Sequence, residues 1–169
     1  ISGWKSDDLI TLFCDKGQVV FLASDQVVTS RTLDGIYPNY DQLIPDDFSK
    51  SITLNRRIFI SALERIAVLA DQHNNVIKLT TELSKQQVSI TADAQDLGSG
   101  SEYISAKFDS DDIQIAFNVR YLLDGLKVIE SDEITLCCNA ATTPAVFLPE
   151  DSELGLTYLV MPVQVRSES

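Results

Sequence analysis

The sequence is short of the residues that most often build catalytic and metal sites. Its 169 residues contain one histidine, His73, which excludes a metal set of two or more histidines. We interpret His73 as the end of a helix, where a histidine suits the helix dipole. The three cysteines, Cys14, Cys137 and Cys138, show no CxxC spacing, so we expect buried, reduced thiols and neither a disulfide nor a zinc site. No motif indicates an enzyme or a cofactor.

Long apolar runs and an excess of positive charge are also missing. No run approaches the roughly 18 apolar residues of a membrane span, and no signal peptide opens the sequence, so we expect a cytoplasmic protein. The 25 acidic residues outnumber the 13 basic ones and give a net charge of −12, which argues against a general nucleic-acid surface. Residues 98–101, Gly-Ser-Gly-Ser, lack the lysine of a phosphate loop, so we expect a hairpin loop there.

The remaining pattern is one of short strands with two helices. Asn55 and Asn118 are good N-caps for helices at 56–72 and 119–129, which show helical periodicity. Strands are expected at 9–13, 18–23, 27–33, 76–81, 87–92, 103–108, 113–117, 133–138, 145–148 and 156–161. Many strands with two segregated helices indicate an α+β fold with antiparallel sheets.

A polar stretch at residues 45–51 is the best candidate for a domain boundary. The part before it holds only strands and is too small to be stable alone, so we expect it to be an incomplete domain. The predicted division is therefore 1–46 and 47–169.

The last predicted strand has an unusual end. Proline cannot donate to a sheet ladder, so Pro162 must lie at a sheet edge or beyond the last paired residue. Met161, Pro162 and Val163 then form an apolar cluster close to solvent. Either this cluster packs on its own domain, or a partner covers it.

Positive charge is concentrated on the two predicted helices. They hold five basic and three acidic residues, a net charge of +2, whereas the rest of the chain holds eight basic and 22 acidic residues, a net charge of −14. Arg120, Asp124 and Lys127 form one stripe in which the acid can pair with both bases. This face is either an ordinary solvated surface or one that meets phosphate groups.

Three separated segments together resemble one family. They are LDGIYPNYDQLIP at 33–45, FNVRYLLDGLK at 117–127 and YLVMP at 158–162. In this order they are similar to the bacterial sliding clamp, the beta subunit of DNA polymerase III. The resemblance covers the chain from about residue 9, and it assigns 1–46 to the end of the clamp's middle domain and 47–169 to its C-terminal domain.

The resemblance implies a non-catalytic processivity factor with the DNA-clamp fold, two helices per domain inside and sheets outside. Two complete subunits would form a ring around double-stranded DNA and tether the DNA polymerase III catalytic subunit, the clamp loader and repair proteins. It implies that the helix residues Arg57, Arg65, Arg120 and Lys127 face the DNA. It also implies that Val68 and Leu69 pack on the neighbouring subunit, although Leu69 could equally be core.

The family also has a hydrophobic pocket for short peptides of its partners. The resemblance assigns eight residues to this pocket: Pro38, Leu43, Asn118, Tyr121, Thr143, Met161, Pro162 and Val163. Gln42 and Gln164 stand where basic residues are common in the family, which affects the expected peptide preference. The alternative to a DNA-encircling clamp is a fragment that binds peptides without loading on DNA.

Overall fold

The computed structural model describes residues 9–23, 26–37, 39–70, 75–94, 98–150 and 155–165. The chain divides into two compact units, Ile1–Asn39 and Tyr40–Ser169, and each is considered by itself. Pro38 and His73 lie outside the described residues, so the predictions made for them have no structural counterpart here.

The first unit is a meander of three antiparallel strands. The strands are β1 (Ile10–Asp15), β2 (Gln18–Ala23) and β3 (Gln26–Arg31). Gly17, with φ of +81°, makes the turn between β1 and β2 because glycine adopts this conformation without strain. Ala23 is buried, but every described residue of β1 and β3 is exposed, including Cys14. The expectation that all three thiols are buried is therefore wrong for Cys14.

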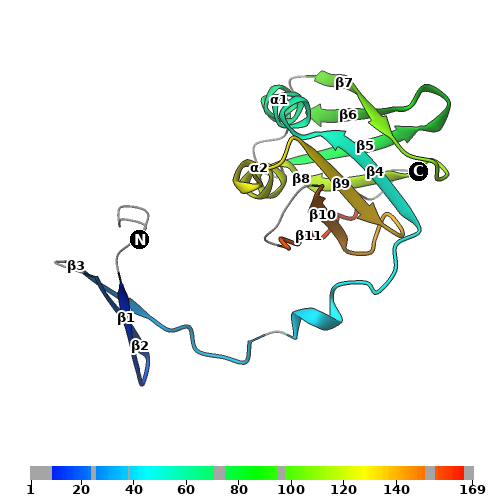
Figure 1. The fold of residues 1–169 in the computed structure, drawn as a ribbon. Coiled ribbons are helices and arrows are strands. Elements are labelled where there is room, and N and C mark those ends of the chain that lie inside the picture. Colours follow the sequence, from blue (N-terminus) through cyan, green and yellow to red (C-terminus); the bar gives the residue numbers. More distant parts are fainter. Residues whose placement is uncertain are drawn as a thin grey trace. The chain divides into compact units, whose positions relative to one another are not determined.

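The second unit is an eight-stranded antiparallel sheet with two helices on one side of it (Figure 1). The strand order is β11-β10-β9-β4-β7-β6-β5-β8. The strands are β4 (Lys50–Asn55), β5 (Val76–Glu82), β6 (Gln87–Ala94), β7 (Gly98–Lys107), β8 (Gln114–Asn118), β9 (Glu133–Cys138), β10 (Ala145–Pro149) and β11 (Tyr158–Val160). Short 3-10 helices occur at η1 (Tyr40–Gln42) and η2 (Leu83–Lys85).

The first helix, α1 (Arg56–Ala67), begins as predicted at the Asn55 cap. The side-chain oxygen of Asn55 accepts a hydrogen bond of 3.0 Å from the backbone N–H of Ile58.

The buried face of α1 consists of Phe59, Ala62, Leu63 and Ile66, the i, i+3, i+4, i+7 pattern of an amphipathic helix. The helical periodicity also predicts Ile58 on this face, but Ile58 is 55% exposed, so that prediction is wrong. The helix also ends earlier than predicted, at Ala67.

The second helix, α2 (Val119–Val128), is capped by Asn118, whose side chain accepts a 3.0 Å hydrogen bond from the N–H of Arg120.

Three fully buried phenylalanine rings, one from a helix and two from strands, fill the core between the helices and the sheet. The ring centroid of Phe147 lies 6.4 Å from that of Phe59 and 6.3 Å from that of Phe117. Among the described residues, no helix is both long and apolar enough to cross a membrane.

Two segments of the sheet differ from the sequence-based prediction. Strand β4 was not predicted, yet it lies inside the sheet and pairs with β9 along its whole length. Residues 98–101 are not a hairpin loop but the first part of β7, paired with β6. The side chain of Leu69 packs against Gly100, and a Cβ at position 100 would overlap it. This close packing accounts for a glycine inside the strand.

Candidate functional site

The C-terminal strand leaves the sheet where the proline predicts. Strand β11 ends at Val160, and Met161 and Pro162 follow it without a ladder position. Three residues beyond the strand, the backbone N–H of Val163 donates a 2.8 Å hydrogen bond to the carbonyl of Ala116 in β8. The chain thus passes from one edge strand of the sheet to the other, and Pro162 lies in this crossing, where no donor is needed.

The start of α2 meets this crossing. Strand β8 leads directly into the Asn118 cap, and Tyr121 in the first turns of α2 is 60% exposed. The hydroxyl of Tyr158, the first residue of β11, donates a 2.7 Å hydrogen bond to the backbone carbonyl of Tyr121. Met161 is 54% exposed, and Pro162 is half-buried. The structure therefore joins the segments of the second and third resemblance motifs, which are far apart in sequence.

A loop between β9 and β10 lies beside the same tail. Thr143 closes this loop, because its hydroxyl oxygen accepts a 3.0 Å hydrogen bond from the N–H of Ala140. A hollow of about 300 Å³ lies between this loop, the C-terminal tail and the sheet. Its lining residues are Lys78, Gln114, Ala116, Ala141, Thr142, Val163, Gln164 and Val165. Thr143 thus follows directly on the loop residues that face the tail.

The first resemblance motif contributes less to this picture. Leu43 follows the 3-10 helix η1, is 48% exposed, and donates its backbone N–H to the carbonyl of Tyr40 at 2.9 Å. Its place against the tail stays a prediction.

The helix cations that were predicted to face DNA are exposed, but three of them already have carboxylate partners. Arg57 lies 3.4 Å from Asp132, with both side chains nearly four-fifths exposed. Lys127 lies 2.7 Å from Glu64 across the two helices. The predicted pairing of Lys127 with Asp124 is therefore replaced by one between α2 and α1.

Arg65 makes the best-formed of these pairs. Its guanidinium donates two hydrogen bonds to Glu102 of β7, at 2.5 Å from Nε and 2.6 Å from Nη2. This bidentate contact lowers the pKa of Glu102 and raises the pKa of Arg65. Arg120, by contrast, is exposed and is the one of the four cations for which the described residues show no ion pair.

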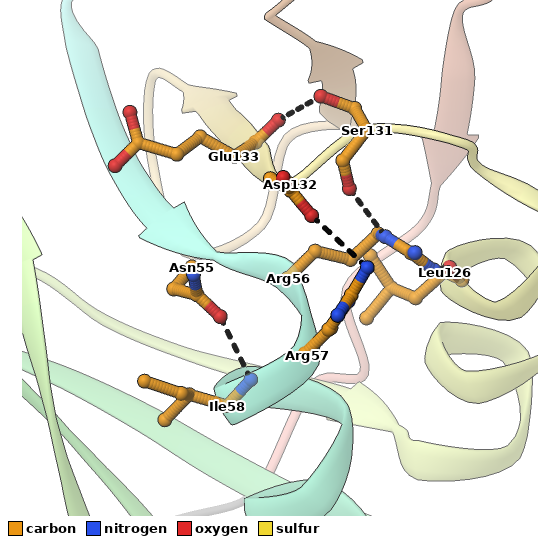
Figure 2. Close-up of polar contacts among 8 residues, drawn as sticks. All are labelled: Asn55, Arg56, Arg57, Ile58, Leu126, Ser131, Asp132 and Glu133. Atoms are coloured by element: carbon orange, nitrogen blue, oxygen red, sulfur yellow. Dashed lines mark hydrogen bonds and ion pairs between the residues drawn. The ribbon is translucent and has the colours of Figure 1, made fainter.

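Arg56 is a helix cation with a structural task. Its Nε donates a 2.6 Å hydrogen bond to the carbonyl of Ser131, and its Nη1 donates a 3.1 Å bond to the carbonyl of Leu126 (Figure 2). Leu126 is in the last turn of α2, whose carbonyls have no partner within the helix. The first residue of α1 therefore caps the end of α2, whereas the neighbouring Arg57 turns to the exposed Asp132.

The end of α1 lies beside a strand edge. Val68 is 76% exposed, whereas Leu69 is partly buried and packs on the core and on Gly100. The alternative reading of Leu69 as core is thus supported. In β7, only Ala106 and Lys107 pair with β4. Within the described residues, the preceding part of β7 therefore pairs with β6 and has no strand on its other side.

The described residues hold no group of three His, Cys, Asp or Glu side chains placed to bind a metal ion. Cys137 and Cys138 are buried free thiols in β9. Burial raises the pKa of Cys138 to about 11 and also raises that of Cys137, so both stay protonated at neutral pH.

Comparison with known proteins identifies the class to which this fold and tail belong. Residues 41–164 match the family model described as DNA polymerase III beta subunit, C-terminal domain. Because this match covers most of the chain, the chain belongs to the DNA polymerase III beta subunit family.

Individual relatives agree. The beta sliding clamp of Synechococcus elongatus is 48% identical over 162 residues, which cover 96% of this chain and 43% of that protein. The crystal structure of the Bacillus subtilis sliding clamp is 31% identical with a TM-score of 0.82, covering 93% of this chain and 41% of that one. A Bartonella birtlesii sliding clamp bound to griselimycin is 29% identical with a TM-score of 0.83, covering 92% and 41%.

The comparisons confirm the resemblance and the clamp fold. The chain spans less than half the length of these relatives. The roles of individual residues and the boundary between residues 46 and 47 remain predictions. Sequence reasoning missed Arg56, Tyr158 and the carboxylate partners of the helix cations, since each contact joins segments at least 37 residues apart.

Proposed function

We propose that this chain is part of a bacterial sliding clamp, a non-catalytic processivity factor of the replication machinery in the cytoplasm. The complete subunit would pair with a second copy, encircle double-stranded DNA, and hold the DNA polymerase III catalytic subunit, the clamp loader and other partners through short peptides. The observation that carries the proposal is the exposed apolar end of the last strand, bonded to β8 at Val163 and joined to α2 through Tyr158.

The proposed peptide pocket has two walls in the described residues. Asn118 and Tyr121 belong to the α2 wall, and Met161, Pro162 and Val163 belong to the tail wall. Thr143 is assigned beside the tail, with Pro38 and Leu43 added from the first motif. Exposed Met161 and Tyr121 offer a partner apolar surface, and burying an apolar side chain contributes roughly 1.5–3 kcal/mol.

Met161→Ala tests this pocket. It should weaken binding of a short fluorescein-labelled peptide with a Leu-Phe pair about tenfold, which corresponds to roughly 1.4 kcal/mol. The folded state should be unaffected, because the side chain is 54% exposed. Val128→Ala is the matched control, since Val128 is an exposed apolar residue at the other end of α2. Equal anisotropy titrations for both variants and the unmodified chain would contradict the pocket.

Griselimycin provides a second probe, because one relative of this chain was solved with it bound. If griselimycin binds this chain at the proposed pocket, it should displace the labelled peptide, and Met161→Ala should weaken both. Simultaneous binding of the two molecules would place griselimycin elsewhere.

The DNA-facing role is proposed for Arg57, Arg65, Arg120 and Lys127. Because three of these cations are paired with carboxylates, a phosphate would have to exchange with a carboxylate, and only weak, sequence-independent attraction is expected. Such weak contacts suit a protein that slides.

Lys127→Glu in the complete subunit tests the DNA side. It should reduce loading on DNA and processivity, most strongly at low salt, because it reverses charge on the proposed DNA face and salt screens such charges. Lys107→Glu is the matched control: Lys107 is also an exposed lysine paired with a glutamate, at 3.2 Å from Glu133, but it lies in β7. Equal loss of processivity in both variants would refute the assignment.

The subunit contact is proposed at Val68, with Leu69 beside it, next to the one-sided part of β7. An exposed valine beside an open strand edge can pack on a second chain. Val68→Glu in the complete subunit should therefore shift sedimentation from dimer to monomer, and an unchanged dimer would rule this contact out.

The ion pairs on the helices favour one alternative, a protein that binds peptides but does not load on DNA. Peptide titration and a separate DNA-loading assay of the complete subunit distinguish the two. Peptide binding without loading would support the alternative.

A further inference from the structure

We infer that Tyr158, seated against Gly125, is a positioning residue that sets the spacing between the α2 wall and the tail wall of the peptide pocket. This inference rests on the proposed function of that pocket. It assigns a role to two residues that are not among the eight assigned to the pocket.

The first observation is the space at Gly125. This glycine is buried in α2 with an ordinary helical backbone, so it is not required for a left-handed turn. A Cβ built there would overlap three atoms of the Tyr158 ring. The helix therefore has a notch at position 125, and the ring of Tyr158 fills it.

The second observation is the hydrogen bond at the tip of the ring. The Tyr158 hydroxyl donates a 2.7 Å hydrogen bond to the backbone carbonyl of Tyr121. Tyr121 lies one helical turn before Gly125. Ring and hydroxyl thus contact two successive turns on the same face of α2. Burial, and the nearby Asp124, raise the pKa of Tyr158, which keeps the hydroxyl protonated as a donor at neutral pH.

The third observation is what lies on either side of this contact. Tyr158 begins β11, and Met161 follows three residues later, before Val163 is bonded to β8. Tyr121 is itself a proposed wall residue. A shift of the Tyr158 ring along α2 would therefore move Met161 relative to Tyr121, and the gap that receives the partner's apolar side chains would change.

Tyr158→Phe tests the hydroxyl with the ring kept. It should weaken binding of the labelled Leu-Phe peptide about three- to tenfold, as expected for loss of one hydrogen bond that fixes the two walls. Tyr103→Phe is the matched control, because Tyr103 is 59% exposed and belongs to β7, which is neither wall of the proposed pocket. It should leave the peptide affinity unchanged.

Gly125→Ala tests the notch, and a double variant separates positioning from stability. Alanine at this position should displace the ring and lower both the thermal midpoint and the peptide affinity. Adding Tyr158→Leu makes room for the new methyl group, so the midpoint should recover in the double variant while the affinity stays at least threefold below that of the unmodified chain. Recovery of affinity together with the midpoint would mean a merely structural contact and would overturn the inference.

The outcomes for the pocket and for the positioning residue differ. If the unmodified chain fails to bind the peptide, the proposed function fails, and the inference fails with it. If it binds, and Tyr158→Phe binds equally well, the pocket stands and the positioning role is refuted.

Discussion

Replacing Arg56 by alanine should destabilise the protein far more than the same change at its neighbour Arg57. Both substitutions remove one positive charge from the first turn of α1. Arg56, however, is half-buried and donates to the carbonyls of Ser131 and Leu126, whereas Arg57 makes one exposed ion pair. The helix dipole alone disfavours a cation at this end of α1, so the contacts with α2 must outweigh it.

The magnitude follows from these contacts. Hydrogen bonds with a charged group contribute roughly 1.5–3 kcal/mol each, and a cation at a helix C-terminus adds about 0.3–1 kcal/mol. Because both hydrogen bonds are only part-buried, we take the lower end, and Arg56→Ala should reduce the free energy of unfolding by about 3 kcal/mol. Arg57→Ala removes an exposed pair at 3.4 Å, and such pairs contribute about 0–1 kcal/mol.

Urea unfolding followed by circular dichroism at a helix-sensitive wavelength measures the difference. With a slope of about 2 kcal/mol per molar urea, Arg56→Ala should lower the midpoint by about 1.5 M, and Arg57→Ala by less than about 0.5 M. Arg56→Lys should lie between Arg56→Ala and the unmodified chain, because lysine retains the charge near α2 but lacks the planar fork that reaches both carbonyls. Equal midpoints for the two alanine variants would refute the assignment of Arg56 as the residue that joins the helices.

Three further predictions concern the rest of the chain. A thiol reagent at neutral pH should modify exposed Cys14 first, whereas Cys138, buried and with its pKa raised to about 11, should react only after unfolding; mass spectrometry of the intact protein would reveal the order. Asn118→Ala should cost about 1 kcal/mol in urea unfolding, because the N–H of Arg120 loses its cap, and an unchanged midpoint would contradict the cap. Gly100→Ala should lower the thermal midpoint by overlap with Leu69, and Leu69→Ala should partly rescue it; additive losses would exclude the contact.

The sequence predicted the features that depend on local rules. Both helix N-termini were found, because the caps Asn55 and Asn118 act on N–H groups within three residues. The proline argument for the tail was also confirmed, because a missing N–H has the same consequence in any sheet.

Features decided by distant neighbours were not predicted. Strand β4 begins with Lys50 and Ser51 and is recognisable as an inner strand only from its partner β9. The glycines of β7 suggested a loop, and only the approach of Leu69 explains them.

For the candidate site, resemblance named the pocket residues, but it could not show what holds them. The contacts of Tyr158 with α2 join residues more than 30 positions apart, and single-sequence periodicity carries no signal for such contacts. Likewise, the charge pattern offered only Asp124, on the same helix, as a partner for Arg120 and Lys127. Asp132 and Glu102, which lie outside the helices, pair with Arg57 and Arg65.

The crossing from β11 to β8 has a consequence for aggregation. An edge strand offers unpaired backbone groups to which a strand of another molecule can attach. Here the bond from Val163 occupies the middle of the β8 edge, β11 is only three residues long, and Pro162 beside it cannot donate. The residues proposed to receive partner peptides thus also limit strand pairing between molecules at the edge strands β8 and β11.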